Sequence, residues 1–216
     1  MRALIVIDVQ RMYDGGGLSI VHPPLTTSLP NITRAMTAAT AAGIPVVVVA
    51  QVPSGLSLAD TAGTEWEQHP ALAGQVVDHL VTKSLPSAFQ DTDLAAWLAT
   101  NEVRTLTLTG YMTHNCVDST ARDAMHRGYT VEVLADATGT PHYANAAGSV
   151  SAETLHTATL TALHARFAAV AGTEAWLDAI ATGAPLPMGD VRSSARAGAA
   201  AHRQSTPTAD RPLTPA

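Results

Sequence analysis

The stretch Ala3-Leu4-Ile5-Val6-Ile7-Asp8-Val9, with Gln10 directly behind it, decides the fold class of this chain. Its apolar residues follow one another without polar interruptions, which is typical of a strand buried on both faces of a parallel sheet. A second apolar run covers 45–50, after a helical stretch over 30–42 that ends at Gly43. The order strand, helix, strand predicts parallel strands joined by helical crossovers.

The same alternation continues toward the C-terminus, up to about residue 182. We expect a single domain over residues 1–184, a three-layer α/β/α fold with a mostly parallel, doubly wound, Rossmann-like sheet. Three loops, at 11–27, 51–75 and 139–150, are expected to carry the specificity of any pocket. The remaining expected strands are 76–82, 105–109, 129–134 and 167–170, and the remaining helices are 93–99 (with Thr92 as N-cap), 117–127, 152–166 and 173–180.

The composition changes at Pro185. From there to the end, Pro, Ala, Ser, Arg and Thr occur without helical or strand periodicity. Such a segment cannot bury enough apolar surface to fold alone. We therefore expect residues 185–216 to be a tail that is disordered or depends on a partner for its structure.

The charge and hydropathy of the chain exclude several classes of protein. The net charge is −6 and no run of Lys or Arg occurs, so we expect no nucleic-acid partner. No apolar run approaches the roughly 20 residues of a membrane span, so we expect no membrane partner. The single Cys excludes an internal disulfide, and no signal peptide pattern precedes the first strand. These features favour a cytoplasmic protein.

Three chemically reactive side chains stand where expected strands end. Asp8 follows the first apolar run, Lys83 follows the run at 76–82, and Cys116 follows the strand at 105–109. Ligands of doubly wound sheets bind beyond the carboxyl ends of the strands, so the three groups could share one pocket. We expect the helix after Cys116 and the Lys83 ammonium to favour the thiolate. Taken singly, each residue also fits a structural role: an inert buried thiol, a surface charge and a turn carboxylate.

Three segments resemble the signatures of the isochorismatase-like cysteine hydrolases. They are Val6–Gln10, Thr82–Ser84 together with Ser87–Phe89, and Gly110–Val117. The resemblance extends over roughly residues 1–182, with further matches at 67–72, 119–124, 128–131, 136–137 and His156. It implies the Rossmann-like fold of that family and an association into homodimers or larger homo-oligomers.

The resemblance also implies a role for each of the three reactive residues. Asp8 would be the general base, Lys83 would hold the thiolate and orient Asp8, and Cys116 would be the nucleophile. The backbone N–H groups of Met112 and Cys116 would form an oxyanion hole, and the peptide bond between Tyr111 and Met112 would be cis.

Two departures narrow the activity that the resemblance implies. Nicotinamidases of this superfamily bind a metal through histidines, which the segment Pro53–Ser57 lacks, so we expect no metal and no cofactor. Isochorismatases that hydrolyse a vinyl ether lack the nucleophilic Cys, and Cys116 therefore argues against that chemistry.

Polar and aromatic residues near the expected pocket are candidate substrate contacts. His114 is either a contact or a turn residue that bonds the backbone, and the aromatic residues are either pocket walls or ordinary core or interface packing. The candidates are Gln10, Tyr13, Gln51, Trp66, Phe89, Tyr111, Thr113, His114 and Tyr143.

The sequence thus predicts a cysteine hydrolase that cleaves a non-peptide C–N bond of a small molecule through a thioester. The substrate would be an amide, a carbamoyl compound or a lactam. An isochorismatase-type vinyl-ether hydrolase is the alternative within the family. A non-catalytic α/β binding module and a flavodoxin-like nucleotide-binding protein are alternatives of other classes.

Overall fold

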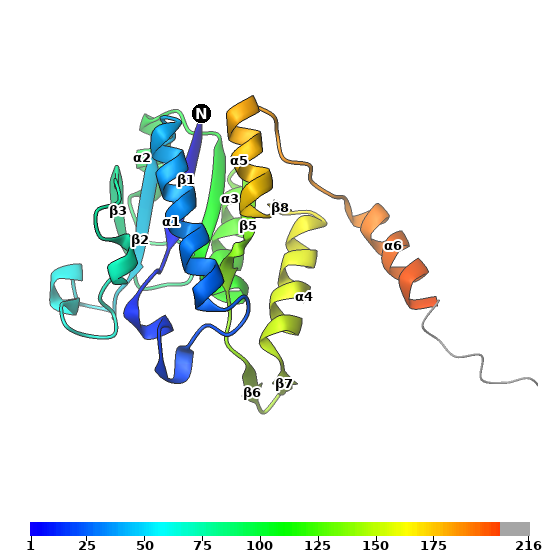
Figure 1. Cartoon of the computed structure of the whole chain (residues 1–216), viewed down its shortest axis with the longest axis horizontal. Helices are drawn as coiled ribbons and strands as arrows, with labels where there is room; N and C mark the ends of the chain where they lie inside the picture. Colours follow the sequence, from blue (N-terminus) through cyan, green and yellow to red (C-terminus); the bar gives the residue numbers. More distant parts are fainter. Residues whose placement is uncertain (204–216) are drawn as a thin grey trace, which may run out of the picture.

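Six parallel strands form the central sheet of the molecule (Figure 1). The computed structural model describes residues 1–203 of the chain. The strand order β3-β2-β1-β4-β5-β8 reverses direction between β1 and β4, which confirms the doubly wound, mostly parallel arrangement. The strands are β1 (Arg2–Ile7), β2 (Val46–Gln51), β3 (His79–Lys83), β4 (Thr105–Tyr111), β5 (Thr130–Gly139) and β8 (Ala169–Ala171).

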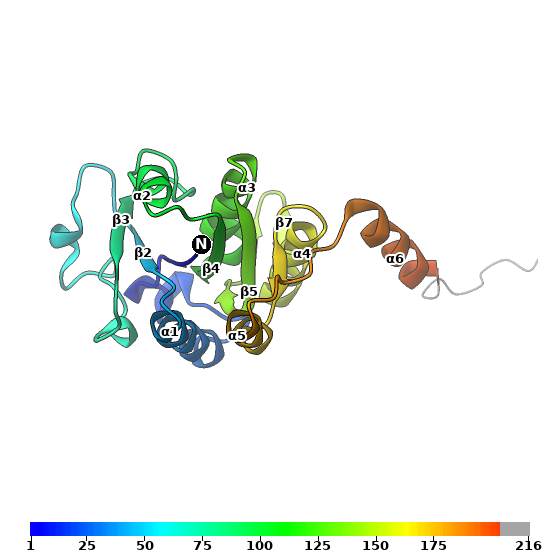
Figure 2. The same ribbon diagram turned by 90° about the horizontal axis from the view of Figure 1, so that it is seen from above.

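Helices cover both faces of this sheet (Figure 2). On one face lie α1 (Leu25–Ala41) and α5 (Thr173–Thr182), and on the other α2 (Leu94–Thr100), α3 (Asp118–His126) and α4 (Ala152–His164). Side chains of β1 alternate between the two layers, with Leu4 and Val6 facing α1 and with Ile5 and Ile7 facing α2 and α3. Both faces of β1 are therefore buried, which explains its uninterrupted apolar sequence.

Two elements are longer than the sequence predicts. Helix α1 starts at Leu25 and continues through Pro30, which the sequence pattern places at the helix start. Pro30 has no N–H to donate, but the turns on both sides of it still pack against the sheet. Strand β5 reaches Gly139 because a register shift next to Leu108 lets it pair with the end of β4.

The three long loops contain short elements of their own. Loop 139–150 holds a hairpin of β6 (Tyr143–Asn145) and β7 (Gly148–Val150). An isolated bridge between Gln10 and Gln68 ties loop 51–75 to the chain behind β1. Single 3-10 turns occupy the other two loops: η1 (Arg11–Tyr13), η2 (Gly16–Leu18), η3 (Leu58–Thr61) and η4 (Pro70–Leu72).

The segment beyond residue 184 differs in part from the expected disorder. Residues Val191–Arg203 form helix α6, whose first turn lines crevices beside α4 while the rest projects from the body, and none of its residues is buried (Figure 1). Alanine is the strongest helix former, and its abundance here gives the segment a helical propensity that the missing periodicity concealed. The helix at 191–203 is compatible with the expected dependence on a partner, so the expectation for 185–216 stays a prediction, and residues 204–216 lie outside the described part. No helix within residues 1–203 is long and apolar enough to cross a membrane.

Gly110 fixes how closely the ends of β1 and β4 approach each other. It pairs with Ile7 and has a φ of +100°. A Cβ at this position would lie 2.0 Å from the carbonyl oxygen of Ile7, so only glycine fits. Because Asp8 directly follows Ile7, the same contact sets the place of the Asp8 backbone relative to the turn after β4.

Candidate active site

Asp8, Lys83 and Cys116 meet at the carboxyl end of the sheet. The Lys83 Nζ atom forms an ion pair with Oδ2 of Asp8 at 2.8 Å and donates a hydrogen bond to Sγ of Cys116 at 3.3 Å. All three residues are buried, and the Asp8 and Lys83 side chains are fully so. The structure thus joins the three strand ends that the sequence singled out into one cluster.

The backbone of Asp8 is held in an unusual conformation. Its φ is +50°, in the left-handed region that non-glycine residues seldom adopt. Its N–H donates to the Val49 carbonyl at 2.8 Å, so β2 fixes the turn. Strain of this kind persists where surrounding structure imposes it, commonly at functional sites. Here it orients the carboxylate toward Lys83.

Gln10 and Gln51 hold Lys83 in place. The Lys83 ammonium donates to Oε1 of Gln51 at 2.5 Å. Gln10 in turn bonds both backbone groups of Gln51, at 2.8 Å and 3.1 Å, and also donates to the Trp66 carbonyl. The amide of Gln10 is therefore committed to the backbone, and the structure gives it a positioning role rather than the predicted substrate contact.

Cys116 lies in a single π-helical turn, η5 (Thr113–Val117), directly before α3. The Met112 carbonyl closes this turn by accepting hydrogen bonds from the N–H groups of Asn115 at 3.0 Å and Val117 at 3.3 Å. The peptide bond between Tyr111 and Met112 is cis, at the place that the resemblance implied. The backbone of Met112 thus begins the turn whose body carries Cys116.

Burial governs the protonation of this cluster. It raises the pKa of Cys116 to about 12, and the negative charge of Asp8 adds to that effect, while Lys83 lowers the pKa only in part. Burial likewise raises the pKa of Asp8, against the opposing effect of Lys83. Lys83 therefore favours the thiolate, as the sequence predicts, but burial and the charge of Asp8 outweigh it. Burial thus favours the protonated thiol of Cys116 and makes the Asp8 carboxylate more basic than usual.

A cavity of about 240 Å³ opens onto Cys116. The predicted residues Tyr13, Gln51, Trp66 and Met112 line it. Five further lining residues escaped prediction: Met12, Leu18, Ser84, Pro86 and Asn115. Several of them are direct neighbours of predicted residues in the chain, and that adjacency was the one available signal.

Three of the predicted contacts lie in the protein interior instead. Phe89 stacks on Tyr129 and lies under the Arg127 guanidinium. The Tyr111 hydroxyl and the Ser28 hydroxyl share a buried hydrogen bond of 2.9 Å. Thr113 bonds Nδ1 of His156 at 2.9 Å and is fully buried. None of the three lines the cavity, because each packs between the sheet and its helices.

His114 and Tyr143 pack against each other beside the catalytic turn. Their rings meet edge to face with centroids 4.6 Å apart. Nδ1 of His114 shares a 2.7 Å hydrogen bond with the Thr140 hydroxyl, and the hydroxyl of Tyr143 points to the Met112 sulfur at 4.0 Å. Burial lowers the pKa of His114, which keeps the imidazole neutral. The pair links the turn to loop 139–150, and the hydrogen-bond partner of His114 is the Thr140 side chain rather than the backbone expected from the sequence.

Acidic and histidine side chains do not gather into a metal site in the described part of the chain. Within residues 1–203, no three His, Cys, Asp or Glu side chains are grouped so that they could hold a metal ion.

A model of the isochorismatase domain matches residues 2–175. The chain belongs to the isochorismatase family. The family match and the amidohydrolases among its relatives make this chain a hydrolase.

Solved and curated relatives agree with this family assignment. A Burkholderia xenovorans LB400 protein assigned to the isochorismatases has a crystal structure that superposes with a TM-score of 0.88 at 50% identity, over 95% of this chain and 98% of its own. The secreted isochorismatase effector Isc1 of Verticillium dahliae is 38% identical over 63% of this chain and 71% of its own length. The ureidoacrylate amidohydrolase RutB of Pseudomonas syringae pv. syringae is 30% identical, over 70% and 77% respectively.

Proposed function

We propose that this isochorismatase-family chain is a cysteine hydrolase that cleaves a non-peptide C–N bond of a small molecule through a thioester. One observation carries the proposal: the Cys116 thiol lines a cavity while its sulfur lies 3.3 Å from Lys83, which is paired with Asp8. A nucleophile, a base and a fixed cation in contact are the parts that covalent acyl transfer requires. The similarity to an amidohydrolase supports the same bond type.

Acylation begins with transfer of the thiol proton to Asp8. The raised pKa of Asp8 makes its carboxylate a stronger base, and the new thiolate stays beside the Lys83 ammonium. Sγ then attacks the carbonyl carbon, and the electron pair of the C=O bond moves to oxygen. As the C–N bond breaks, the leaving nitrogen takes the proton from Asp8, and a thioester on Cys116 remains.

Hydrolysis of the thioester uses Asp8 a second time. The carboxylate takes a proton from a water molecule, whose oxygen bonds to the acyl carbon. The C–S bond breaks, and the proton on Asp8 returns to Sγ. The products are a carboxylic acid (or a carbamic acid, from a ureide) and ammonia or an amine, and the resting thiol is restored.

The turn after β4 supplies the oxyanion stabilisation in this proposal. The N–H groups of Met112 and Cys116 belong to the same short turn, and both residues line the cavity. Donors fixed in the backbone need no reorganisation when charge develops on the carbonyl oxygen, and losing one such donor typically costs about 10²–10³ in rate.

Vinyl-ether hydrolysis is the second candidate, because one relative is named an isochorismatase. That reaction protonates an enol ether and needs no sulfur–carbon bond. The buried thiol in contact with Lys83 has no task in it, which is why we favour C–N cleavage. A non-catalytic binding module has no use for the Asp8–Lys83 pair either, since burying two charges costs several kcal/mol per ion before pairing.

The decisive experiment compares the wild type with Cys116→Ala and Cys116→Ser on a panel of primary amides, ureides and carbamoyl compounds. We expect ammonia or amine release by the wild type and none by either variant. Rapid quenching followed by intact-mass measurement should show an acyl adduct on the wild type alone. Full release by Cys116→Ala would refute the thioester mechanism, and hydrolysis of isochorismate alone would favour the vinyl-ether alternative.

We also propose that the protein works in a reducing compartment such as the cytoplasm. Its nucleophile is the only Cys of the chain and has to remain a thiol. Activity should fall on treatment with hydrogen peroxide. Dithiothreitol should restore the activity of molecules whose Cys116 is oxidised only to the sulfenic acid. Unchanged activity in peroxide would argue against this dependence.

A further inference from the structure

The cavity at Cys116 has no charged wall. Its ten lining residues include no Lys, Arg, His, Asp or Glu. Met12, Leu18, Trp66, Pro86 and Met112 give it an apolar surface, and Tyr13, Gln51, Ser84, Asn115 and Cys116 give it neutral polar groups. Burial raises the pKa of Tyr13, so its phenol also stays uncharged.

The one ammonium close to the cavity is already neutralised. Lys83 pairs with Asp8 at 2.8 Å, and its other contacts are Gln51 and the Cys116 sulfur. The side chains of the Asp8–Lys83 pair are completely buried, so the pair offers a substrate no net charge. A second anion would therefore face Asp8 as well as Lys83.

Other cations near the cavity mouth are turned away or paired. Arg11 adjoins the lining residue Met12, but its side chain is half exposed, binds Glu67 at 3.0 Å and lines a separate crevice. Arg122 binds both oxygens of Asp118 at 2.8 Å. His114 is part of the turn that carries Cys116, and its imidazole is neutral because burial lowers its pKa.

We propose that the substrate is a small uncharged amide with an apolar body, and not a carboxylate or phosphate. The inference rests on the proposed C–N hydrolysis and specifies its substrate class. An anion placed in this cavity would lose its hydration without gaining a cation, at a cost of several kcal/mol. Met12, Leu18 and Trp66 would pack against the apolar part, while Tyr13, Ser84 and Asn115 have the neutral donors and acceptors that an amide needs.

The size of the cavity limits the substrate further. The volume of the cavity is about 240 Å³. It lies below the range of about 300–1,000 Å³ that is usual for drug-sized ligands. An amide of this size has room for a short apolar chain and little else. Ureidoacrylate, which the name of a relative gives as its substrate, carries a carboxylate and would lack a cation to pair with in this cavity.

The single Cys allows a direct test of the charge preference that does not depend on hydrolysis. Iodoacetamide and iodoacetate carry the same electrophilic CH₂–I group. They differ in the group attached to it, which is a neutral amide in iodoacetamide and a carboxylate in iodoacetate. Each forms a bond from Sγ to its CH₂ carbon, iodide leaves, and the thiol proton is lost to the base. We would measure both alkylation rates of Cys116 by intact mass and divide each by its rate with free N-acetylcysteine.

We expect iodoacetamide to be favoured at least tenfold over iodoacetate, beyond the preference of the free thiol. Leu18→Arg places a cation on the cavity wall at a side chain that is already 40% exposed, and it should remove most of this preference. Leu18→Gln is the matched uncharged control and should keep it. Equal or faster reaction of the wild type with iodoacetate would overturn the proposal.

A second measurement separates this inference from the proposed function. Two primary amides of equal length are compared, one ending in a methyl group and one in a carboxylate, such as pentanamide and succinamate. We expect the neutral amide to have at least a 100-fold higher kcat/KM. Preferred hydrolysis of succinamate by a Cys116-dependent route would overturn the substrate class and leave the hydrolase intact. Release of ammonia by Cys116→Ala would instead overturn the hydrolase mechanism.

Discussion

The Asp8 carboxylate has to be ionised before it can accept the thiol proton, so its pKa sets the acid limb of the activity. Burial raises that pKa above the ordinary 3.8, because the charged form is poorly solvated. As pH falls through the raised value, Asp8 takes up a proton and loses its function as base. We expect kcat/KM to decline as pH falls, with the midpoint of this decline at a pH above 3.8. We expect Asp8→Asn to be inactive at every pH. An acid limb at or below 3.8 would contradict the raised pKa.

Removing the Lys83 ammonium should slow acylation on the order of 10³-fold, because the thiolate then forms without a neighbouring cation. We would measure the acylation rate of Lys83→Ala and of Lys83→Met by single-turnover kinetics. Met keeps most of the volume of the Lys side chain, so it separates the charge from the packing. Without Lys83, the buried Asp8 carboxylate would be an unpaired charge, but it can take up a proton and become neutral. We therefore expect both variants to remain folded. Unfolding of both would mean that Lys83 is mainly a structural ion-pair partner.

His156 should make the folded protein less stable in acid. Burial lowers its pKa from 6.5 to about 4, and the nearby His22 acts in the same direction. Between these pH values the unfolded chain binds a proton that the folded chain excludes, so the free energy of unfolding falls as pH falls from about 6.5 to 4. Urea unfolding of the wild type and of His156→Asn across this range should give a steeper pH slope for the wild type. Equal slopes would refute the prediction.

The sequence alone identifies part of the site. Asp8, Lys83 and Cys116 were identified because strand ends meet at one edge and because the family resemblance fixed their order. Phe89 and Tyr111 were misplaced because closeness along the chain does not tell which way a side chain points. The raised pKa of Cys116 escaped prediction, since the depth of burial depends on the whole fold and outweighs the visible ammonium.

At the scale of elements, the pairing of β1 with β4 should tolerate no side chain at Gly110. Gly110→Ala would bring a Cβ to 2.0 Å from the Ile7 carbonyl oxygen in a left-handed backbone conformation. We expect a loss of about 3 kcal/mol or more and a strong loss of activity, because Asp8 has to move with Ile7. Thermal unfolding and steady-state kinetics would measure the two effects.

Gly128→Ala is the matched control for this substitution. Gly128 also has a positive φ, +89°, but an added Cβ meets no atom within 4 Å. Gly128→Ala should therefore lower the free energy of unfolding by only about 1–2 kcal/mol, from strain in the left-handed backbone conformation, and leave kcat unchanged. Similar losses in the two variants would show that the contact with Ile7 is unimportant.

The elements themselves differ in how well the sequence predicts them. β1 and β2 are apolar on both faces, and this pattern needs no knowledge of their neighbours. The extension of β5 to Gly139 depends on a register shift against β4, which arises only when the strands pair. The π-helical turn at Thr113–Val117 has no periodicity of its own, and it lies between the expected strand at 105–109 and the expected helix at 117–127.

For the whole molecule, the strand order explains why the site lies where it does. The sheet winds from β1 toward β3 in one direction and from β4 toward β8 in the other, which leaves a crevice between β1 and β4. Asp8 and Cys116 follow those two strands, and Lys83 reaches across from the end of β3. The sequence predicts this fold because each strand is buried and each crossover is helical. It does not predict helix α6, which has no apolar periodicity and buries none of its residues.

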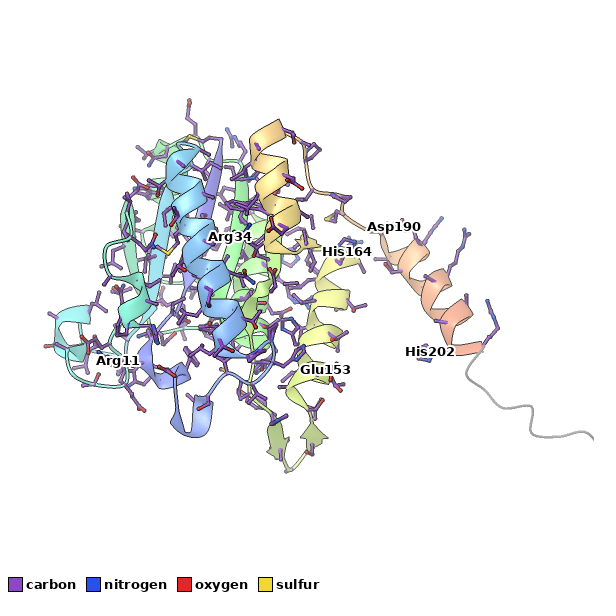
Figure 3. All side chains as sticks on the ribbon, in the orientation of Figure 1. Arg11, Arg34, Glu153, His164, Asp190 and His202 are labelled. Atoms are coloured by element: carbon purple, nitrogen blue, oxygen red, sulfur yellow. The ribbon has the colours of Figure 1, made fainter. Side chains whose placement is uncertain are left out.

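Helix α6 leads to a prediction about assembly. An isolated helix of 13 residues is marginal in water, and α6 buries none of its residues against its own body (Figure 3). It carries Arg192, Arg196 and Arg203 and no acidic residue, whereas residues 1–184 hold 16 Asp and Glu against 8 Lys and Arg. The charges of α6 therefore complement the body of a second copy of this chain, and we propose a homo-oligomer in which α6 packs on that copy.

Truncation after residue 184 tests this assembly. We expect the shortened chain to remain folded, since the buried residues of both core clusters lie before residue 184 and only the partly buried Leu186 packs against them from beyond it. It should also keep most of its activity, since no residue of the cavity lies beyond 184. Light scattering after size-exclusion chromatography should show a homo-oligomer for the full chain and a smaller species for the truncated one. Replacing Arg192, Arg196 and Arg203 together by Gln should weaken association in low salt, and raising the salt concentration should do the same to the wild type. A full-length monomer, or an oligomer unaffected by truncation, would show that α6 does not join copies of this chain.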